Sequence, residues 1–438
     1  MLRPDNFSDV CSHADCCALA GAAAFFAGIP DAAVVVNGPM WCYFYAMRHL
    51  EDSLPLLSQR MHCTQLDNES IVFGSEEYLR ETLQPYVQEP PALLCIENNC
   101  SASLIGDDTA GIARDMGFHC PVVVFDSGGL TGGFAEGYVK ASLAVLDTLP
   151  LQSCSRPEPQ RVNLLGLTTG YYNGVNDRRE LVRLLQLAGY EVNACPGDGT
   201  PAGLLSDIPR AALNIVVHEE LGLAMAQVLK ERMGMPFIAP GAPYGTTGTK
   251  RWLEKIHAVL PAPSLPAVLA EIERVQNGLL LRINDFKMTW DELWFDEVVI
   301  AAPPSAAFGL AEALRTEWAD TGHLTVIVQQ ANTDPVRERK ESWLDTVYSA
   351  AVDGDKIQRH LAQMKTGLVM GSSNESILLR RAGCGQVQLF PVAFPVEARI
   401  LLTDAPFMGL RGAQYIQECL WNEKVGQIFY SVPKEDQE

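Results

Sequence analysis

Residues 92–108 read ALLCIENNCSASLIGDD, an apolar run that ends in polar residues and a cysteine. The apolar part, residues 92–96, has the length and composition of a buried strand, and a helical pattern follows at residues 104–116. Short runs rich in Val, Ile and Leu alternate with longer helical patterns in the same way along the chain. This alternation is typical of parallel βαβ units. The sequence therefore predicts an α/β protein with doubly wound, parallel sheets.

The alternating pattern occurs three times, which predicts three Rossmann-like domains. The expected boundaries are residues 1–155, 156–292 and 293–438. A polar segment with prolines, residues 152–160, is expected to link the first two domains. Further prolines precede a long amphipathic helix expected at residues 265–275. The length of 438 residues is compatible with this number of domains.

Composition excludes several classes of function. The net charge is −20 and the basic clusters are short, whereas nucleic-acid binding requires a concentrated basic surface. No run approaches the roughly 20 apolar residues of a membrane span. The first residues, MLRPDNFSDV, show no secretory signal. We therefore expect a cytoplasmic protein that binds neither nucleic acid nor membrane.

Cysteines are numerous and crowded near the start of the chain. The sequence has twelve, and five fall in the first 63 residues: Cys11, Cys16, Cys17, Cys42 and Cys63. In a reducing compartment, such crowding favours metal binding or redox chemistry over disulfides. No CxxC pair is present, which argues against a zinc ribbon or a thioredoxin-like centre.

Three cysteines occupy positions where helices are expected to begin. Cys42 follows a strand predicted at residues 32–36, Cys100 follows the strand at 92–96, and Cys17 opens an Ala- and Gly-rich helix. The carboxyl ends of parallel strands meet at one sheet edge, and helix N-termini favour thiolates and anionic clusters. A lone cysteine is more often a small buried apolar residue. That interpretation is preferred for five others: Cys120, Cys154, Cys195, Cys384 and Cys419.

Several segments resemble the component 1 proteins of nitrogenase and their relatives. Cys17-Ala-Leu-Ala-Gly-Ala, with Gly38-Pro39-x-x-Cys42, is similar to the β-subunit pattern C-x-x-x-G-A … H-G-x-x-G-C, including the separation of 25 residues between the cysteines. Residues 67–74 resemble E-x-x-x-V-F-G-G, and residues 100–108 match C-x-x-x-x-I-G-D-D closely. Weaker similarities lie at residues 197–200, 394–395 and 409–412.

The resemblance implies that Cys17, Cys42 and Cys100 ligate an iron–sulfur cluster, either 4Fe–4S or P-cluster-like 8Fe–7S. Cys16, Cys63 and Cys95 remain alternative ligands. Three thiolates leave a four-iron cluster one ligand short. The fourth ligand is therefore expected from a second subunit or from a non-cysteine group. A second component 1 subunit is expected, in a homodimer or a heterotetramer with the cluster at the interface.

The sequence departs from the family pattern at several positions, which limits the residue roles that the resemblance implies. His218 aligns with the cofactor-ligating cysteine of the nitrogenase α subunit, and Arg399 aligns with its cofactor-ligating histidine. Both are candidate cofactor-binding residues, but neither supports a molybdenum–iron cofactor held as in nitrogenase. Asn37 replaces a histidine and Trp41 replaces a glycine near Cys42, so the cluster type stays open.

The implied function is that of a nitrogenase-like reductase subunit. An ATP-dependent iron–sulfur reductase, similar to the nitrogenase iron protein, would pass low-potential electrons through the cluster to a substrate or cofactor. The substrate stays open, and His218, Glu219 and Glu220 are the nearest candidate proton donors. A non-catalytic scaffold for metallocluster maturation is the alternative. A metal-free binding protein is a third interpretation.

Overall fold

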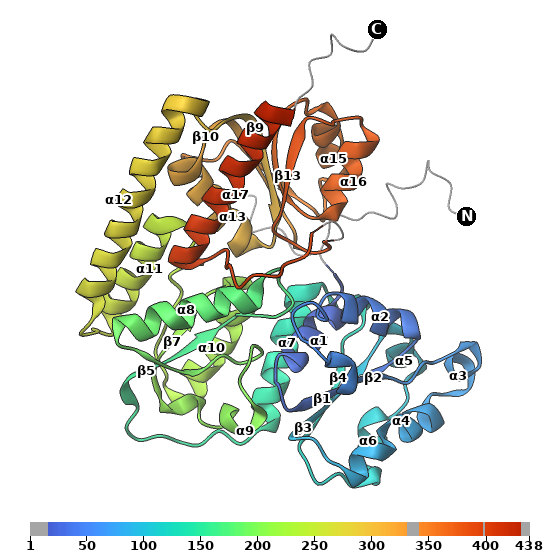
Figure 1. The fold of residues 1–438 in the computed structure, drawn as a ribbon. Helices are drawn as coiled ribbons and strands as arrows, with labels where there is room; N and C mark the ends of the chain where they lie inside the picture. The colour runs from blue at the N-terminus through green and yellow to red at the C-terminus, as the bar shows by residue number, and fades with distance from the viewer. Residues whose placement is uncertain (1–15, 331–340, 397–398, 431–438) are drawn as a thin grey trace.

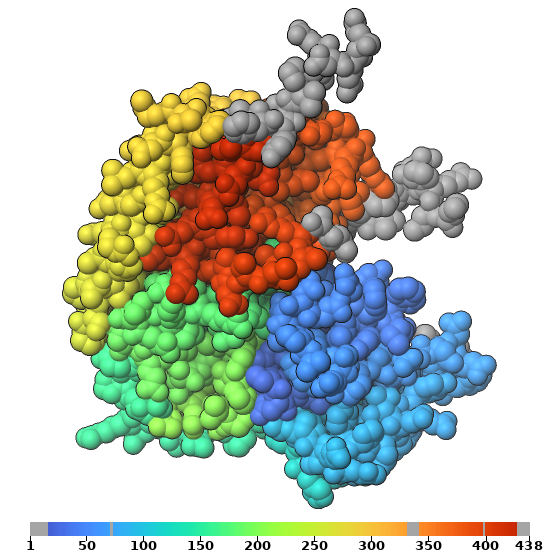
Figure 2. All heavy atoms as spheres, viewed as in Figure 1, coloured from blue at the N-terminus to red at the C-terminus, as the bar shows by residue number. Residues whose placement is uncertain are grey.

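The computed structural model describes residues 16–330, 341–396 and 399–430 of the chain. Cys11 lies outside these residues. Three parallel sheets with flanking helices follow one another along the sequence, which confirms the predicted fold class (Figure 1). The N-terminal, middle and C-terminal thirds pack against one another (Figure 2). Within the described residues, no helix is long and apolar enough to cross a membrane.

The first sheet has the strand order β2-β1-β3-β4. Its strands are β1 (Ala32–Asn37), β2 (Met61–Cys63), β3 (Leu93–Asn98) and β4 (Val122–Asp126). Its helices are α1 (Ala18–Ala27), α2 (Met40–Arg48), α3 (Asn68–Phe73), α4 (Glu76–Gln88), α5 (Cys100–Ile105), α6 (Thr109–Met116) and α7 (Phe134–Thr148). β1 and β3 are buried throughout, as expected for strands covered on both faces.

The second sheet repeats this arrangement with the order β6-β5-β7-β8. Its strands are β5 (Glu158–Leu165), β6 (Glu191–Ala194), β7 (Ala211–Val216) and β8 (Phe237–Ile238). Its helices are α8 (Gly174–Ala188), α9 (Ala202–Leu205), α10 (Glu219–Met233) and α11 (Gly245–Val259). α12 (Leu265–Trp290) then leads to the third sheet.

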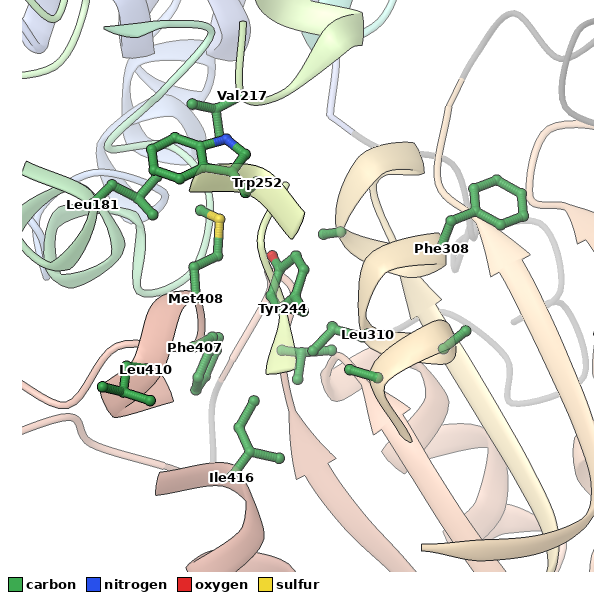
Figure 3. Packing of buried hydrophobic residues seen from close by; sticks show 14 of the residues in the cluster. Leu181, Val217, Tyr244, Trp252, Phe308, Leu310, Phe407, Met408, Leu410 and Ile416 are labelled. Atoms are coloured by element: carbon green, nitrogen blue, oxygen red, sulfur yellow. The ribbon is translucent and has the colours of Figure 1, made fainter. Parts of the chain in front are cut away.

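The third sheet has five strands in the order β11-β10-β9-β12-β13. They are β9 (Trp294–Ala302), β10 (Asp320–Val328), β11 (Thr346–Ser349), β12 (Gly367–Gly371) and β13 (Val387–Pro391). Its helices are α13 (Pro304–Ala313), α15 (Gly354–Gln363), α16 (Ser373–Arg381) and α17 (Gly409–Tyr430). One apolar core joins the second and third sheets, and Tyr244, Phe407 and Met408 lie within it (Figure 3).

The structure corrects several predicted element boundaries. The helix expected at residues 104–116 is two helices, because Gly106 takes a left-handed conformation with φ of 78° and ends α5. The helix expected to begin near Cys42 begins at Met40, which puts Cys42 inside its first turn. The end of the expected linker 152–160 belongs to β5. The helix expected at 265–275 continues to Trp290.

Each sheet reverses its strand order at one point: between β1 and β3, between β5 and β7, and between β9 and β12. Such a switch point opens a crevice beyond the carboxyl ends of the strands. Cys42 and Cys100 follow the two strands at the first switch point, and His218 follows β7 at the second. The sequence positions of the candidate residues therefore match the places where this fold forms sites.

α1 and α7 cross with almost no side chain between their backbones. A Cβ atom placed on Gly21 would lie 1.9 Å from the carbonyl oxygen of Phe134, and one on Gly137 would lie 1.9 Å from that of Ala18. At the end of α1, a Cβ atom on Gly28 would lie 1.8 Å from the carbonyl oxygen of Gly197, in the second sheet's region. These contacts accept only glycine without a backbone shift.

Gly137→Ala is expected to destabilise the fold by about 1–3 kcal/mol, because the added methyl group overpacks the crossing. Gly278→Ala in α12 is the matched control, since a Cβ atom there has nothing within 4 Å. The control is expected to be neutral or slightly stabilising, as alanine favours helix. Urea unfolding measures both variants. Equal free energies of unfolding for the two variants would contradict the close crossing of α1 and α7.

Candidate functional site

Three cysteines lie at the beginnings of three helices on the first sheet. Cys17 is the N-cap of α1, Cys42 lies in the first turn of α2, and Cys100 is the first residue of α5. The residue before α5, Asn99, caps that helix and also donates a hydrogen bond from Nδ2 to the Cys42 thiol at 3.4 Å. Neighbouring strands β1 and β3 thus place Cys42 and Cys100 at one sheet edge.

A glycine turn after β4 brings Cys17 beside Cys100. A Cβ atom placed on Gly129 would lie 3.3 Å from Cys17 Cβ and 3.8 Å from Cys100 Sγ. One on Gly128 would lie 2.9 Å from Cys100 Sγ and 2.6 Å from its backbone nitrogen. Cys17 is held there by an antiparallel bridge to Gly133. The two glycines leave room between the thiols that any larger side chain would fill.

The two neighbouring thiols affect the charge of Cys17. Desolvation raises the pKa of the Cys17 thiol, and the neighbouring Cys42 and Cys100 raise it further, while the backbone N–H groups of Ala20 and Leu19 lower it. A positive centre among the thiols would relieve this repulsion, and helix N-termini already favour negative charge there. The donor set therefore fits an iron–sulfur cluster.

The thiols do not converge on one point. Among the residues that the structure describes, no three His, Cys, Asp or Glu side chains are close enough to hold a single metal ion. A cluster has different requirements, because each thiolate binds its own iron. Three separated thiols suit a polynuclear cluster better than a single ion.

The alternative cysteines lie differently. Cys16 Sγ lies 2.5 Å from His49 Nε2, although Cys16 precedes Cys17 directly. Cys95 is fully buried in β3, and burial raises its pKa well above the usual range. Cys63 ends β2 and contacts the carbonyl oxygen of Gly38 at 3.3 Å. Burial is the main cause that raises the pKa of Cys63 to about 11, and the charge of the Cys42 thiol adds to it.

Large apolar side chains are exposed around the three cysteines. Trp41, Phe44 and Tyr45 of α2 contact one another and are 44–68 % exposed. Leu104 of α5 and Leu130 of the glycine turn are each 74 % exposed. Exposed aromatic and aliphatic groups of this size mark an interaction surface.

A cavity of about 730 Å³ lies where the three sheets meet. Residues that follow β5, β7 and β13 contribute to its wall, together with residues of α2. Its wall is rich in aromatic groups, among them Phe44, Phe134, Tyr171, Tyr172, Phe394 and Phe407. A largely apolar cavity with a few polar groups is typical of a ligand site at switch points.

The two predicted cofactor-binding residues do not lie in the same space. His218 lines the cavity, is 3 % exposed, and has a pKa lowered to about 3 by burial. Arg399 lines a smaller neighbouring pocket of about 330 Å³. Its guanidinium packs over Phe390 and donates a hydrogen bond to Tyr415 Oη at 3.0 Å. Of these two residues, His218 alone faces the larger cavity.

The cavity and the thiol site are neighbours, because the consecutive residues Cys16 and Cys17 belong to one each. Cys16 and His49 both line the cavity, while Cys17 faces Cys100 and the glycine turn. Burial lowers the pKa of His49 to about 4, so its ring is neutral at pH 7. One peptide unit therefore separates the thiol site from the cavity wall.

Three parallel sheets around a shared cavity place the chain in the class of multidomain α/β proteins with a site at the strand ends. The family described as "Nitrogenase component 1 type Oxidoreductase" matches residues 17–423, and the chain belongs to this family. This membership confirms the resemblance inferred from the cysteine motifs.

Curated relatives and solved structures agree with the assignment. The chain is 26 % identical over 359 residues to a light-independent protochlorophyllide reductase subunit of Methylobacterium sp., covering 79 % of this chain and 67 % of that protein. For the corresponding reductase subunit of Rhodopseudomonas palustris, identity is 25 %, covering 76 % and 62 %. The solved structure "Nitrogenase Cp1 at pH 5" superposes with a TM-score of 0.76 at 19 % identity, covering 96 % and 90 %. The chain thus spans about two thirds of the length of these two reductase subunits.

The sequence did not reveal the residues that connect these features. The turn Gly128–Gly129 carries no metal-binding motif, and its role depends on the position of β4 beside β3. The aromatic wall comes from residues far apart in sequence. Asn99 gave a usable signal, because Asn is a preferred N-cap and directly precedes Cys100.

His218 predicts a specific loss of stability in acid. Its folded pKa of about 3 lies below the usual value of about 6.5. Between these values the unfolded chain binds a proton that the folded chain does not, so stability falls as pH falls. His218→Gln should remove about 2–3 kcal/mol of the stability lost between pH 7 and pH 4.5. Urea unfolding at both pH values measures the difference.

His119→Gln, at an exposed position, is the control for this experiment. It should leave the acid-induced loss as in the wild type. A loss of the same size in His218→Gln as in the control would contradict the burial of a neutral imidazole at the cavity wall.

Proposed function

We propose that this chain is a nitrogenase-like reductase subunit that carries an iron–sulfur cluster on Cys17, Cys42 and Cys100. The observation that carries the proposal is the position of these three thiols at the starts of neighbouring helices, with Cys17 and Cys100 against a glycine turn and Cys42 bonded to Asn99. When bound, such a cluster supplies one-electron chemistry at low potential. Family membership supports a redox role for the chain as a whole.

The chain's own residues hold and tune the site. Asn99 donates a hydrogen bond to the Cys42 sulfur, and hydrogen bonds to cluster sulfurs adjust reduction potential. Gly128 and Gly129 keep the space between Cys17 and Cys100 open. The exposed side chains Trp41 and Leu130 would exclude water from the site once a second subunit covers them.

The partners follow from the same features. The fourth ligand would come from a second component 1 subunit, in a homodimer or a heterotetramer. Electrons would come from an ATP-dependent iron–sulfur reductase of the iron-protein type. With the proposed domain boundaries 1–155, 156–292 and 293–438, the cluster would belong to the first domain and the cavity would lie between all three.

The cavity would hold the substrate or a second cofactor, with His218 on its wall and Arg399 in the pocket behind. The relatives' name mentions protochlorophyllide, so a tetrapyrrole is the first substrate to test. The aromatic wall suits a flat, conjugated molecule, because aromatic rings stack on one another. The protein's contribution would be to orient this molecule and exclude water.

Cluster binding can be tested by iron and acid-labile sulfide analysis of anaerobically purified protein. Cys17→Ala, Cys42→Ala and Cys100→Ala are each expected to lose more than about 90 % of the iron, because each removes a direct ligand. Cys384→Ala is the control, since this cysteine lies at the third sheet and its thiol donates to the carbonyl oxygens of Leu361 and Ala362. Retention of iron by any of the three variants would overturn the ligand assignment.

Turnover distinguishes the reductase from a maturation scaffold. With the iron-protein-type partner, ATP and reductant, a reductase converts substrate repeatedly. A scaffold would instead release its cluster to an acceptor protein without repeated conversion. The second result would replace the reductase proposal with the scaffold alternative.

Subunit association is expected to depend on the exposed aromatic face of α2. Trp41→Lys should shift the assembly toward a monomer, because a charge there opposes burial. Sedimentation velocity measures the change, with Leu204→Lys as the control at another exposed apolar position, 52 % exposed on α9. Equal oligomer content in both variants would show that α2 is not part of the interface.

A further inference from the structure

A thin wall separates the aromatic cavity from a second hollow on its outer side. This outer hollow has a volume of about 830 Å³ and is rich in charged groups, including Glu219, Arg251, Lys255 and Glu312. Glu220 and Ser305 line the outer hollow, whereas His218 lines the inner cavity. These three side chains therefore form the wall between the outer hollow and the inner cavity, as we call the aromatic cavity of about 730 Å³.

The three side chains form a continuous hydrogen-bonded chain. His218 Nδ1 lies 2.6 Å from Ser305 Oγ, and Ser305 Oγ lies 2.7 Å from Glu220 Oε1. The first distance is short for a hydrogen bond between nitrogen and oxygen, and the second is typical of a bond between two oxygens. Tyr171 Oη donates to the same Glu220 oxygen at 3.1 Å, and its ring packs edge-to-face on His218. The chain thus runs from the outer hollow to the inner cavity without a gap.

The fold holds these three hydrogen-bonded side chains at the boundary between the second and third sheets. His218 is the N-cap of α10, and Glu220 lies in the first turn of that helix. Ser305 lies in the first turn of α13, which Pro303 and Pro304 begin. Because proline fixes the backbone at the start of a helix, Ser305 is held firmly across this boundary. Its backbone N–H also points to Glu220 Oε1, at 3.4 Å.

We propose that Glu220, Ser305 and His218 form a proton relay that delivers protons from the outer hollow to the molecule reduced in the inner cavity. The inference rests on the proposed reductase function, because saturating one double bond consumes two electrons and two protons. The electrons come from the low-potential partner, and the protons come from water in the outer hollow. Both hydroxyl and imidazole groups can donate and accept, as a relay requires.

The transfer balances without any change of oxidation state in the relay. In the structure the Ser305 hydroxyl donates to Glu220 Oε1. Once Glu220 is protonated, this hydroxyl turns toward His218 Nδ1, the proton of Glu220 passes to Ser305 Oγ, the Ser305 hydroxyl proton passes to His218 Nδ1, and the proton on Nε2 passes to the substrate. Outer water then protonates Glu220, and tautomer exchange of the ring restores the starting arrangement. One proton has moved from water to the substrate. Burial raises the pKa of Glu220, which favours its role as the proton-loaded end.

Nitrogen-15 NMR of histidine-labelled protein tests the relay without turnover. The chain has eight histidines, and His218→Gln assigns the relevant ring. Glu220→Gln should change the tautomer balance of His218 in the wild-type background, because the direction of hydrogen bonding reverses along the chain. The same replacement should have no effect in Ser305→Ala. No response in the wild type, or an equal response in Ser305→Ala, would overturn the relay.

Turnover provides the second readout. Ser305→Ala should lower substrate reduction about 100-fold, the low end for lost acid–base catalysis. Iron content and reduction by the partner should stay unchanged, and Ser305→Thr should restore the rate together with the wild-type solvent isotope effect. Ser142→Ala, which removes a buried hydroxyl bonded to the carbonyl oxygen of Val139, is the matched control. Unchanged turnover in Ser305→Ala would also overturn the relay.

The two readouts separate the two proposals. If the wild type reduces no substrate, the proposed function fails. The NMR experiment still decides whether a change at Glu220 reaches His218 through Ser305. If the wild type is active and Ser305→Ala is equally active, the function stands and the relay fails.

Discussion

The backbone contact between α1 and α7 is the constraint on which the rest of the structure depends. Gly21 and Gly137 let the two helices touch through their main chains, and this contact sets the position of the start of α1. Cys17 begins α1, and Gly129 lies in the turn that precedes α7, so the same crossing places the thiol next to Cys100. The candidate cluster site is thus an outcome of helix packing.

The same helices connect the first sheet to the second. Tyr138 of α7 donates a hydrogen bond to the carbonyl oxygen of Leu167 at 2.6 Å, just beyond β5. Gly28 at the end of α1 contacts Gly197, and the backbone N–H of Gly199 bonds to the carbonyl oxygen of Gly28 at 2.7 Å. The thiol site and the aromatic cavity are therefore held in a fixed relation. A fixed distance between the thiol site and the cavity is what a protein would need to pass electrons between them.

Much of the fold could be predicted from the sequence, because strands buried on both faces give continuous apolar runs. The apolar runs that form β1 and β3 could be recognised for this reason. Shorter or more polar elements gave no such signal: β2 has only three residues, and α4 carries a proline inside the helix. The order of the strands, which creates the switch points, was implied only by the fold class.

The candidate site could be predicted only in part. Cys42 and Cys100 were placed by a local rule, since each follows a strand and begins a helix. The family resemblance added Cys17 as a ligand. The closeness of Ser305 to Glu220 follows no local rule, because 85 residues separate them and two sheets must pack to join them. Contacts across a seam between domains are decided by packing, and a single sequence does not reveal them.

The central claim is that iron sits among Cys17, Cys42 and Cys100, beside the cavity. The most direct test is an iron anomalous-difference map from crystals that are grown without oxygen and without the reductase partner. We predict iron density within bonding distance of all three sulfurs and at the surface formed by α2 and α5. Iron bound to other residues, or no iron after anaerobic reconstitution, would contradict the claim.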